Sequence, residues 1–147
     1  MAEKLLLIIL GILLLFCSVQ DLWRKKIYIW ILGAGAALIL ICLPFCENLI
    51  LMSRVGGLIV GLTVILISKI TAGKIGMGDG ILLCVTGLGL GFWANMELFG
   101  IALSLAAVLS IVLLILRLVD RKKSIPFIPF LFVGYLILFV SSGGVMI

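Results

Sequence analysis

Six apolar runs separated by short polar links dominate this chain and restrict most strongly how it can fold. Most fall short of the roughly 20 residues that a helix needs to cross a bilayer squarely, but flanking Lys and Arg can snorkel. Prolines near the start of the last run are tolerated in a first helical turn. We predict an all-α integral membrane protein with about six transmembrane helices. The runs are Leu5–Val19, Ile27–Leu43, Val55–Ile70, Ile81–Ala94, Leu98–Leu118 and, approximately, Pro126–Val140.

The overall composition supports a membrane protein. Of the 147 residues, 65% are hydrophobic and 12% are charged. A soluble domain is about half apolar and about a quarter charged. We interpret residues 1–147 as a single polytopic membrane domain. The basic residues form short clusters between apolar runs, without the basic stripe and interleaved aromatics of nucleic-acid-binding proteins, so no nucleic-acid partner is expected.

The Lys and Arg residues are distributed unequally between the two sets of links. The positive-inside rule assigns the richer set to the cytoplasm. We therefore expect a multi-pass protein of the cell inner (plasma) membrane with both termini on the outer side. Lys4 and Arg54 belong to the opposite side. The first run is expected to remain as a helix, because no small-residue cleavage site follows it. The nine residues of the richer set are Arg24, Lys25, Lys26, Lys69, Lys74, Arg117, Arg121, Lys122 and Lys123.

The residues that usually bind metals are scarce. There is no His, and none of the four cysteines forms a CxxC pair, so we expect no zinc site, no other metal and no cofactor. The cysteines are interpreted as small buried hydrophobes, although Cys42 and Cys46 could meet near the outer face. The other two are Cys17 and Cys84.

Small residues recur at a spacing of four within the apolar runs. Such spacing lets membrane helices approach closely, and we predict ordinary helix packing at these positions. The pairs are Gly57 with Gly61, Gly87 with Gly91, and Gly33 with Ala37.

Two aspartates are predicted at the same membrane depth. Asp21 follows the first run in "SVQDLWRKK", and Asp79 precedes the fourth run in "KIGMGDG". If these helices pack together, the two close carboxyls cannot both ionise easily. The pair is then expected to share one proton. One can then act as a base on water while the other acts as an acid toward a carbonyl, as in aspartic peptidases. This chemistry requires neither a metal nor a histidine.

The glycines around Asp79 suggest room for a substrate. Gly76, Gly78 and Gly80 permit backbone angles that other residues avoid, and they let another main chain approach. An extended peptide could therefore lie beside the acids.

Simpler roles are open for each acid. Asp79 could cap the helix that it precedes, and Asp21 could pair with Arg24 or Lys25. Asp120, among basic residues, is interpreted as solvated. Two acids at one depth in an otherwise basic cytoplasmic face favour a functional site.

The chain resembles the type IV prepilin peptidases, which are membrane aspartic peptidases with a GxGD motif. "GMGD" (76–79) matches that motif, and Asp21 stands where the family has its first catalytic aspartate. "IPFIPFLFVG" (125–134) is similar to the proline-phenylalanine segment of the family, and it contributes Pro126, Phe127 and Pro129 as structural or substrate-positioning residues.

The resemblance implies an endopeptidase that removes the short basic leader from prepilin or pseudopilin substrates at the cytoplasmic membrane face. Asp21 and Asp79 would be catalytic, with Gly76 and Gly78 shaping the motif. The sequence departs from the family at Ile27-Tyr28-Ile29, where Ile-Pro-Asn is frequent, and after the motif, where a Lys is frequent. The methyltransferase domain of long members is missing, so neither methylation nor S-adenosylmethionine is expected. The length resembles that of the Tad-type peptidases.

Two other function classes are compatible with acids in a membrane protein. A small proton- or cation-coupled transporter or channel would have acids nearer the middle of the membrane and paired broken helices. A non-catalytic membrane scaffold would tolerate Asp→Asn at both positions.

Overall fold

A computed structural model describes residues 2–24, 29–42, 44, 51–71, 76–116 and 126–143 of the chain. Within these ranges the protein is helical and contains no strand, which confirms the predicted all-α class. Helices occupy every one of the six apolar runs. They are α1 (Ala2–Arg24), α2 (Ile29–Cys42), α3 (Leu51–Ile70), α4 (Met77–Ile115) and α5 (Ile128–Ser141).

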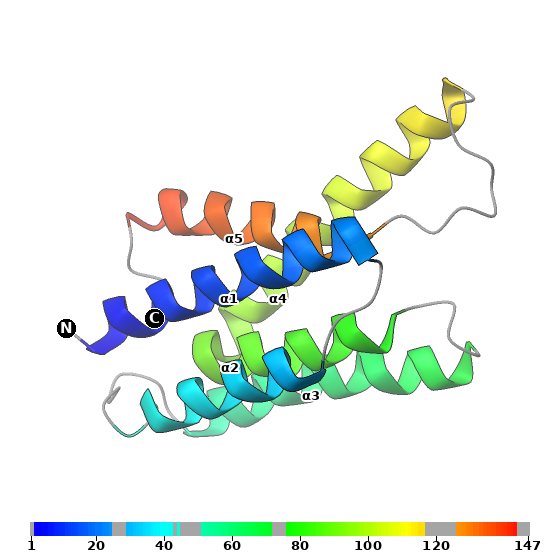
Figure 1. Ribbon diagram of the computed structural model, residues 1–147. Helices are drawn as coiled ribbons and strands as arrows, with labels where there is room; N and C mark the ends of the chain where they lie inside the picture. Colours follow the sequence, from blue (N-terminus) through cyan, green and yellow to red (C-terminus); the bar gives the residue numbers. More distant parts are fainter. Residues whose placement is uncertain are drawn as a thin grey trace.

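The helices run alternately up and down along one bundle. The C-terminal ends of α1 and α3 and the N-terminal ends of α2, α4 and α5 gather at one pole, at the right of Figure 1. The N-terminal end of α1 and the C-terminal end of α5 lie at the other pole. We call these the aspartate pole and the opposite pole. Among the described helices, α1, α3 and α4 are long and apolar enough to cross a membrane, and α2 and α5 are shorter apolar helices.

The fourth and fifth runs form the two halves of α4, which are two helices that meet at a sharp corner. A straight helix of 39 residues would be about 60 Å long, far more than a bilayer requires. At Gly91 the backbone leaves the helical region, with φ 79° and ψ −175°, and the chain turns back on itself (Figure 1). The predicted link between Ala94 and Leu98 was wrong by a few residues. The residues of the predicted link belong to the second half of α4, because the chain already turns at Gly91, where glycine permits the non-helical backbone angles of the corner.

Polar side chains hold this corner together. The N–H of Phe92, which begins the second half of α4, donates a hydrogen bond of 3.1 Å to the Ser53 hydroxyl of α3. The fully buried Asn95 side chain donates to the carbonyls of Gly57 and Leu83, each at 3.2 Å. Asn95 thus connects both halves of α4 with α3, and it satisfies polar groups that burial would otherwise leave unpaired.

Small residues let α3 and the first half of α4 pack closely. A Cβ added at Gly57 would collide with the backbone of Gly87, and one at Gly61 would collide with the backbone of Cys84. The packing role predicted for these glycines is confirmed. The prediction was wrong for Gly91, which forms the corner, and for Gly33, where nothing lies within 4 Å of an added Cβ.

The remaining packing joins α5 to α1 and α4, and α2 to α1 and α4. Leu10 and Leu14 of α1 are fully buried in the same core as Leu82 of α4 and Leu131 of α5. The outer surface keeps many large apolar side chains exposed; Phe16 of α1, for example, is 60% exposed. An apolar exterior of this kind suits a lipid environment.

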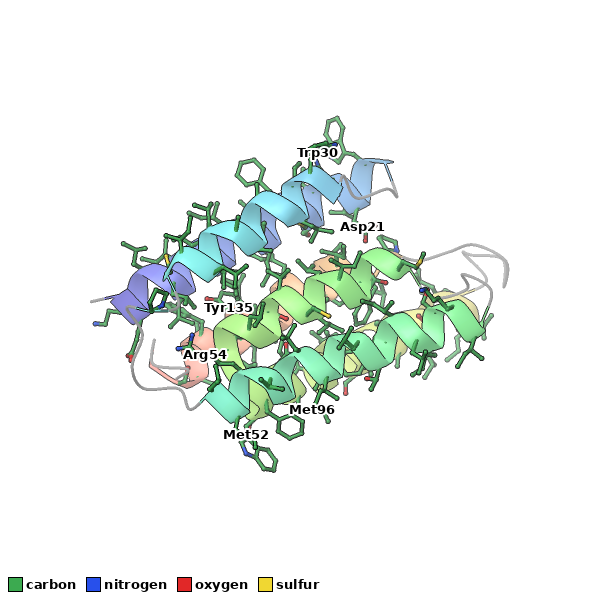
Figure 2. The ribbon with its side chains drawn as sticks, turned by 90° about the horizontal axis from the view of Figure 1, so that it is seen from below. Asp21, Trp30, Met52, Arg54, Met96 and Tyr135 are labelled. Atoms are coloured by element: carbon green, nitrogen blue, oxygen red, sulfur yellow. The ribbon has the colours of Figure 1, made fainter. Side chains whose placement is uncertain are left out.

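Arg54 departs from its predicted place. We expected it in an outer link, but it lies in the first turn of α3 and is 6% exposed. Figure 2 shows Arg54 and Asp21 toward opposite ends of the bundle. The predicted separation of these two residues along the bundle is therefore seen, although Arg54 belongs to a helix.

Candidate active site

Asp21 is a buried acid that joins α1 to α5. It lies in the last turn of α1, and its side chain is 8% exposed. Its Oδ2 accepts a hydrogen bond of 3.3 Å from the backbone N–H of Ile128, the first residue of α5. A buried carboxylate requires such donors, because removing a charge from water is costly. The position of Asp21 is thus fixed by two helices that are distant in sequence.

Asp79 lies in the first turn of α4, at the same pole. Its backbone N–H donates to the carbonyl of Gly76 at 3.2 Å, and its half-buried carboxyl interacts electrostatically with that of Asp21. In Figure 2, Asp21 is directed from α1 toward the start of α4. The structure therefore places the two aspartates at the same pole, near enough for their carboxyls to interact electrostatically. Two adjacent carboxyls of this kind can divide acid and base roles between them.

The glycines of the motif matter because they lack a side chain where there is no room for one, and not because they adopt unusual backbone angles. Gly76 has φ −63° and ψ 123°, and Gly78 and Gly80 lie in helical α4. Among the described glycines, positive φ occurs at Gly91 and Gly143, so the predicted need for permissive angles at the motif was wrong. A Cβ added at Gly76 would lie 2.9 Å from Oδ2 of Asp79, and one at Gly80 would press on Ile65 of α3.

The proline-phenylalanine segment lies beside Asp21. Pro126 and Phe127 precede α5, and Pro129 occupies its first turn. The Phe127 ring packs edge-to-face on Phe99 of α4, with centroids 6.3 Å apart. These residues are therefore positioned around the start of α5, where Ile128 meets the carboxyl of Asp21.

Of the simpler roles considered for the two acids, the structure tests helix capping by Asp79 but not the pairing of Asp21 with Arg24 or Lys25. Gly76 is the N-cap of α4 and no side-chain capping bond is present there, so Asp79 does not act as the expected cap. The side chain of Arg24, together with Lys25 and Asp120, lies outside the described residues. The proposed meeting of Cys42 and Cys46 also falls outside them.

Sequence reasoning missed two neighbours of Asp21. One is the Ile128 N–H, for which the signal was a proline at the next position that marks a helix start. The other is Cys17, one turn earlier on α1, whose buried thiol interacts electrostatically with Asp21. The spacing of four residues in a helix could have indicated it.

The fold and the site together define a helical membrane protein with an acidic pair at one pole. The family model described as the type IV leader peptidase family matches residues 8–115, and the chain belongs to that family. The matched range includes both Asp21 and Asp79, and it ends before α5. No curated protein and no solved structure matches the chain. Family membership implies a peptidase that acts on a protein substrate.

Proposed function

We propose that this protein is a membrane aspartic endopeptidase that removes the short basic leader from type IV prepilin-like proteins. Asp21 and Asp79 are its catalytic residues. The observation that supports this most directly is that the two carboxyls, which come from helices far apart in the sequence, lie at one pole (Figure 1) and interact electrostatically. Neither a metal nor S-adenosylmethionine takes part in the proposed reaction.

The proposed reaction uses one proton shared by the pair. The ionised aspartate takes a proton from water as the water oxygen attacks the scissile carbonyl carbon, and the protonated aspartate gives its proton to the carbonyl oxygen. The tetrahedral intermediate then collapses as the first aspartate returns a proton to the leaving nitrogen. The second takes one from a hydroxyl, which releases an acid and an amine and restores the pair.

The proposed location is the cytoplasmic face of the inner membrane. Arg24 and Lys69 lie at the ends of α1 and α3 at the aspartate pole, and the positive-inside rule assigns such an end to the cytoplasm. Trp23 and Trp30 flank the same pole with 86% and 89% of their side chains exposed. Indole rings favour the membrane–water interface, which supports a site at that depth. Both chain termini are then outside.

The competing transporter hypothesis finds little support in the broken helix. The break at Gly91 lies near Ser53, in the first turn of α3, and thus at the pole opposite Asp79. It separates two antiparallel passes and does not open a helix beside the acids. The Gly76 surroundings, where a Cβ would crowd Asp79, favour a site that admits a substrate main chain.

The test is a cleavage assay. Purified protein in lipid is mixed with prepilin-like proteins from its own genome, and the product N-terminus is sequenced. We expect cleavage at the leader boundary without added metal, and a loss of rate on the order of 10²-fold to 10⁴-fold in Asp21→Asn and in Asp79→Asn. Asn keeps an acceptor for the Ile128 N–H, so folding should persist. Glu97→Gln, at an exposed acid, is the matched control.

Two results would reject the proposal. Well-folded protein that cleaves no prepilin-like substrate would favour the transporter. Full cleavage by both Asp→Asn variants would show that the pair is not catalytic.

A further inference from the structure

The start of α5 offers Asp21 one particular backbone donor. The first four residues of a helix have N–H groups without partners in the preceding turn. In α5, Pro129 has no N–H, and the N–H groups of Phe130 and Leu131 both donate to the Phe127 carbonyl, at 3.0 and 3.3 Å. The Ile128 N–H is thus the remaining donor of this turn, and it points to Oδ2 of Asp21. The missing N–H of Pro129 contributes to this selection.

The surroundings of the two carboxyls are therefore unequal. Asp21 accepts a backbone hydrogen bond from the first turn of α5, and such a bond favours a carboxylate over a neutral acid. The positive end of a helix lies beside both carboxyls, because Asp79 is in the first turn of α4, so the hydrogen bond is what distinguishes them. Among the described residues, none donates a hydrogen bond to the carboxyl of Asp79. The thiol of Cys17, on the same helix, is a further titratable group beside Asp21.

We propose that the Ile128 N–H holds Asp21 as the ionised member of the pair and leaves the shared proton on Asp79. This inference rests on the proposed peptidase function and assigns its two roles. Asp21 is then the base that takes the proton from water, and Asp79 is the acid that protonates the carbonyl oxygen. Ile128 acts through Asp21 and is a positioning residue, and Pro129, which has no N–H, helps to leave the Ile128 N–H as the donor.

The protonation state can be measured without any substrate. The chain has three aspartates, Asp21, Asp79 and Asp120, so labelling with [4-¹³C]aspartate gives three carboxyl resonances in the full-length protein in lipid nanodiscs. Each is assigned by its disappearance in the corresponding Asp→Asn variant. At neutral pH we expect the chemical shift of a protonated carboxyl for Asp79 and that of a carboxylate for Asp21. A protonated Asp21 beside an ionised Asp79 would overturn the inference.

Ile128→Pro tests the donor itself, because it removes the N–H at a helix position that tolerates proline. Ile128→Val keeps the N–H and also trims the buried side chain, so it is the matched control. We expect the Asp21 resonance to move toward the protonated position in Ile128→Pro and to stay in place in Ile128→Val. Equal positions in both folded variants would show that the donor does not set the proton. If Ile128→Pro does not fold, the wild-type assignment still decides.

The outcomes separate this inference from the peptidase proposal. Cleavage together with a proton on Asp21 would retain the peptidase and reject the division of roles. The predicted resonances without cleavage of any substrate would retain the asymmetry and reject the peptidase.

Discussion

The hydroxyl of Tyr135 donates a hydrogen bond of 2.7 Å to the carbonyl of Leu7, and so fastens α5 to α1 on the side of the bundle away from Asp21. The contact is buried and joins residues 128 positions apart. With the Asp21–Ile128 bond it makes a second polar attachment between the same two helices. The two bonds fix how far α5 can slide along α1.

Tyr135→Phe is therefore expected to lower the free energy of unfolding by about 1 kcal/mol, the usual net contribution of a hydrogen bond. Unfolding in mixed micelles measures the change. Ser142→Ala removes an exposed bond within α5 and should stay within about 0.5 kcal/mol of wild type. Equal stability of Tyr135→Phe and wild type would mean that this attachment contributes nothing.

Gly57→Ala should destabilise the protein by about 1–3 kcal/mol, because the new Cβ meets the backbone of Gly87 and the two helices must move apart. Gly33→Ala is the matched control: its Cβ meets nothing within 4 Å, and alanine favours a helix by about 1 kcal/mol over glycine. The same unfolding measurement should give opposite signs for the two. Two neutral substitutions would show that α3 and α4 do not pack through these glycines.

Gly91→Ala should cost about 1–3 kcal/mol of stability, because φ 79° with ψ −175° belongs to a region that is essentially restricted to glycine. Gly100→Ala lies in the same element with open space around it, and it should be tolerated. Thermal unfolding in detergent compares them. If Gly91→Ala melts with the wild type, the corner must be formed by other residues.

Gly76→Ala should affect catalysis more than folding. The added methyl would lie 2.9 Å from Oδ2 of Asp79 and would crowd the space where the substrate carbonyl must approach. We expect kcat/KM to fall on the order of tenfold, which corresponds to about 1.4 kcal/mol of transition-state stabilisation. The melting temperature should change little. Steady-state cleavage kinetics are the measurement, and an unchanged kcat/KM would place the substrate elsewhere.

The sequence predicted the helices well because apolar runs and helix length obey simple physical limits. It also brought Asp21 and Asp79 to one pole, since topology alone determines which ends of successive helices meet. The prediction of a packing role for Gly91 was wrong because two glycines four residues apart are equally compatible with helix packing and with a corner. The tertiary contacts of Ser53 and Asn95, which distinguish the two, are not local in sequence.

The hydrogen-bond partner of Asp21 on α5 could not be predicted from the sequence either. The prolines indicated where α5 begins, and the structure shows that helix starting at Ile128. Which acid the free N–H of that turn would meet depends on how α5 packs against α1. No periodicity in either segment encodes this contact.

The Asp21–Ile128 bond spans 107 residues, and this separation has a consequence for biosynthesis. A ribosome makes both aspartates well before it reaches α5, so Asp21 enters the membrane before this donor has been synthesised. The bond can form only when α5 arrives. The hydrogen bond that holds Asp21 is thereby timed to the synthesis and insertion of α5.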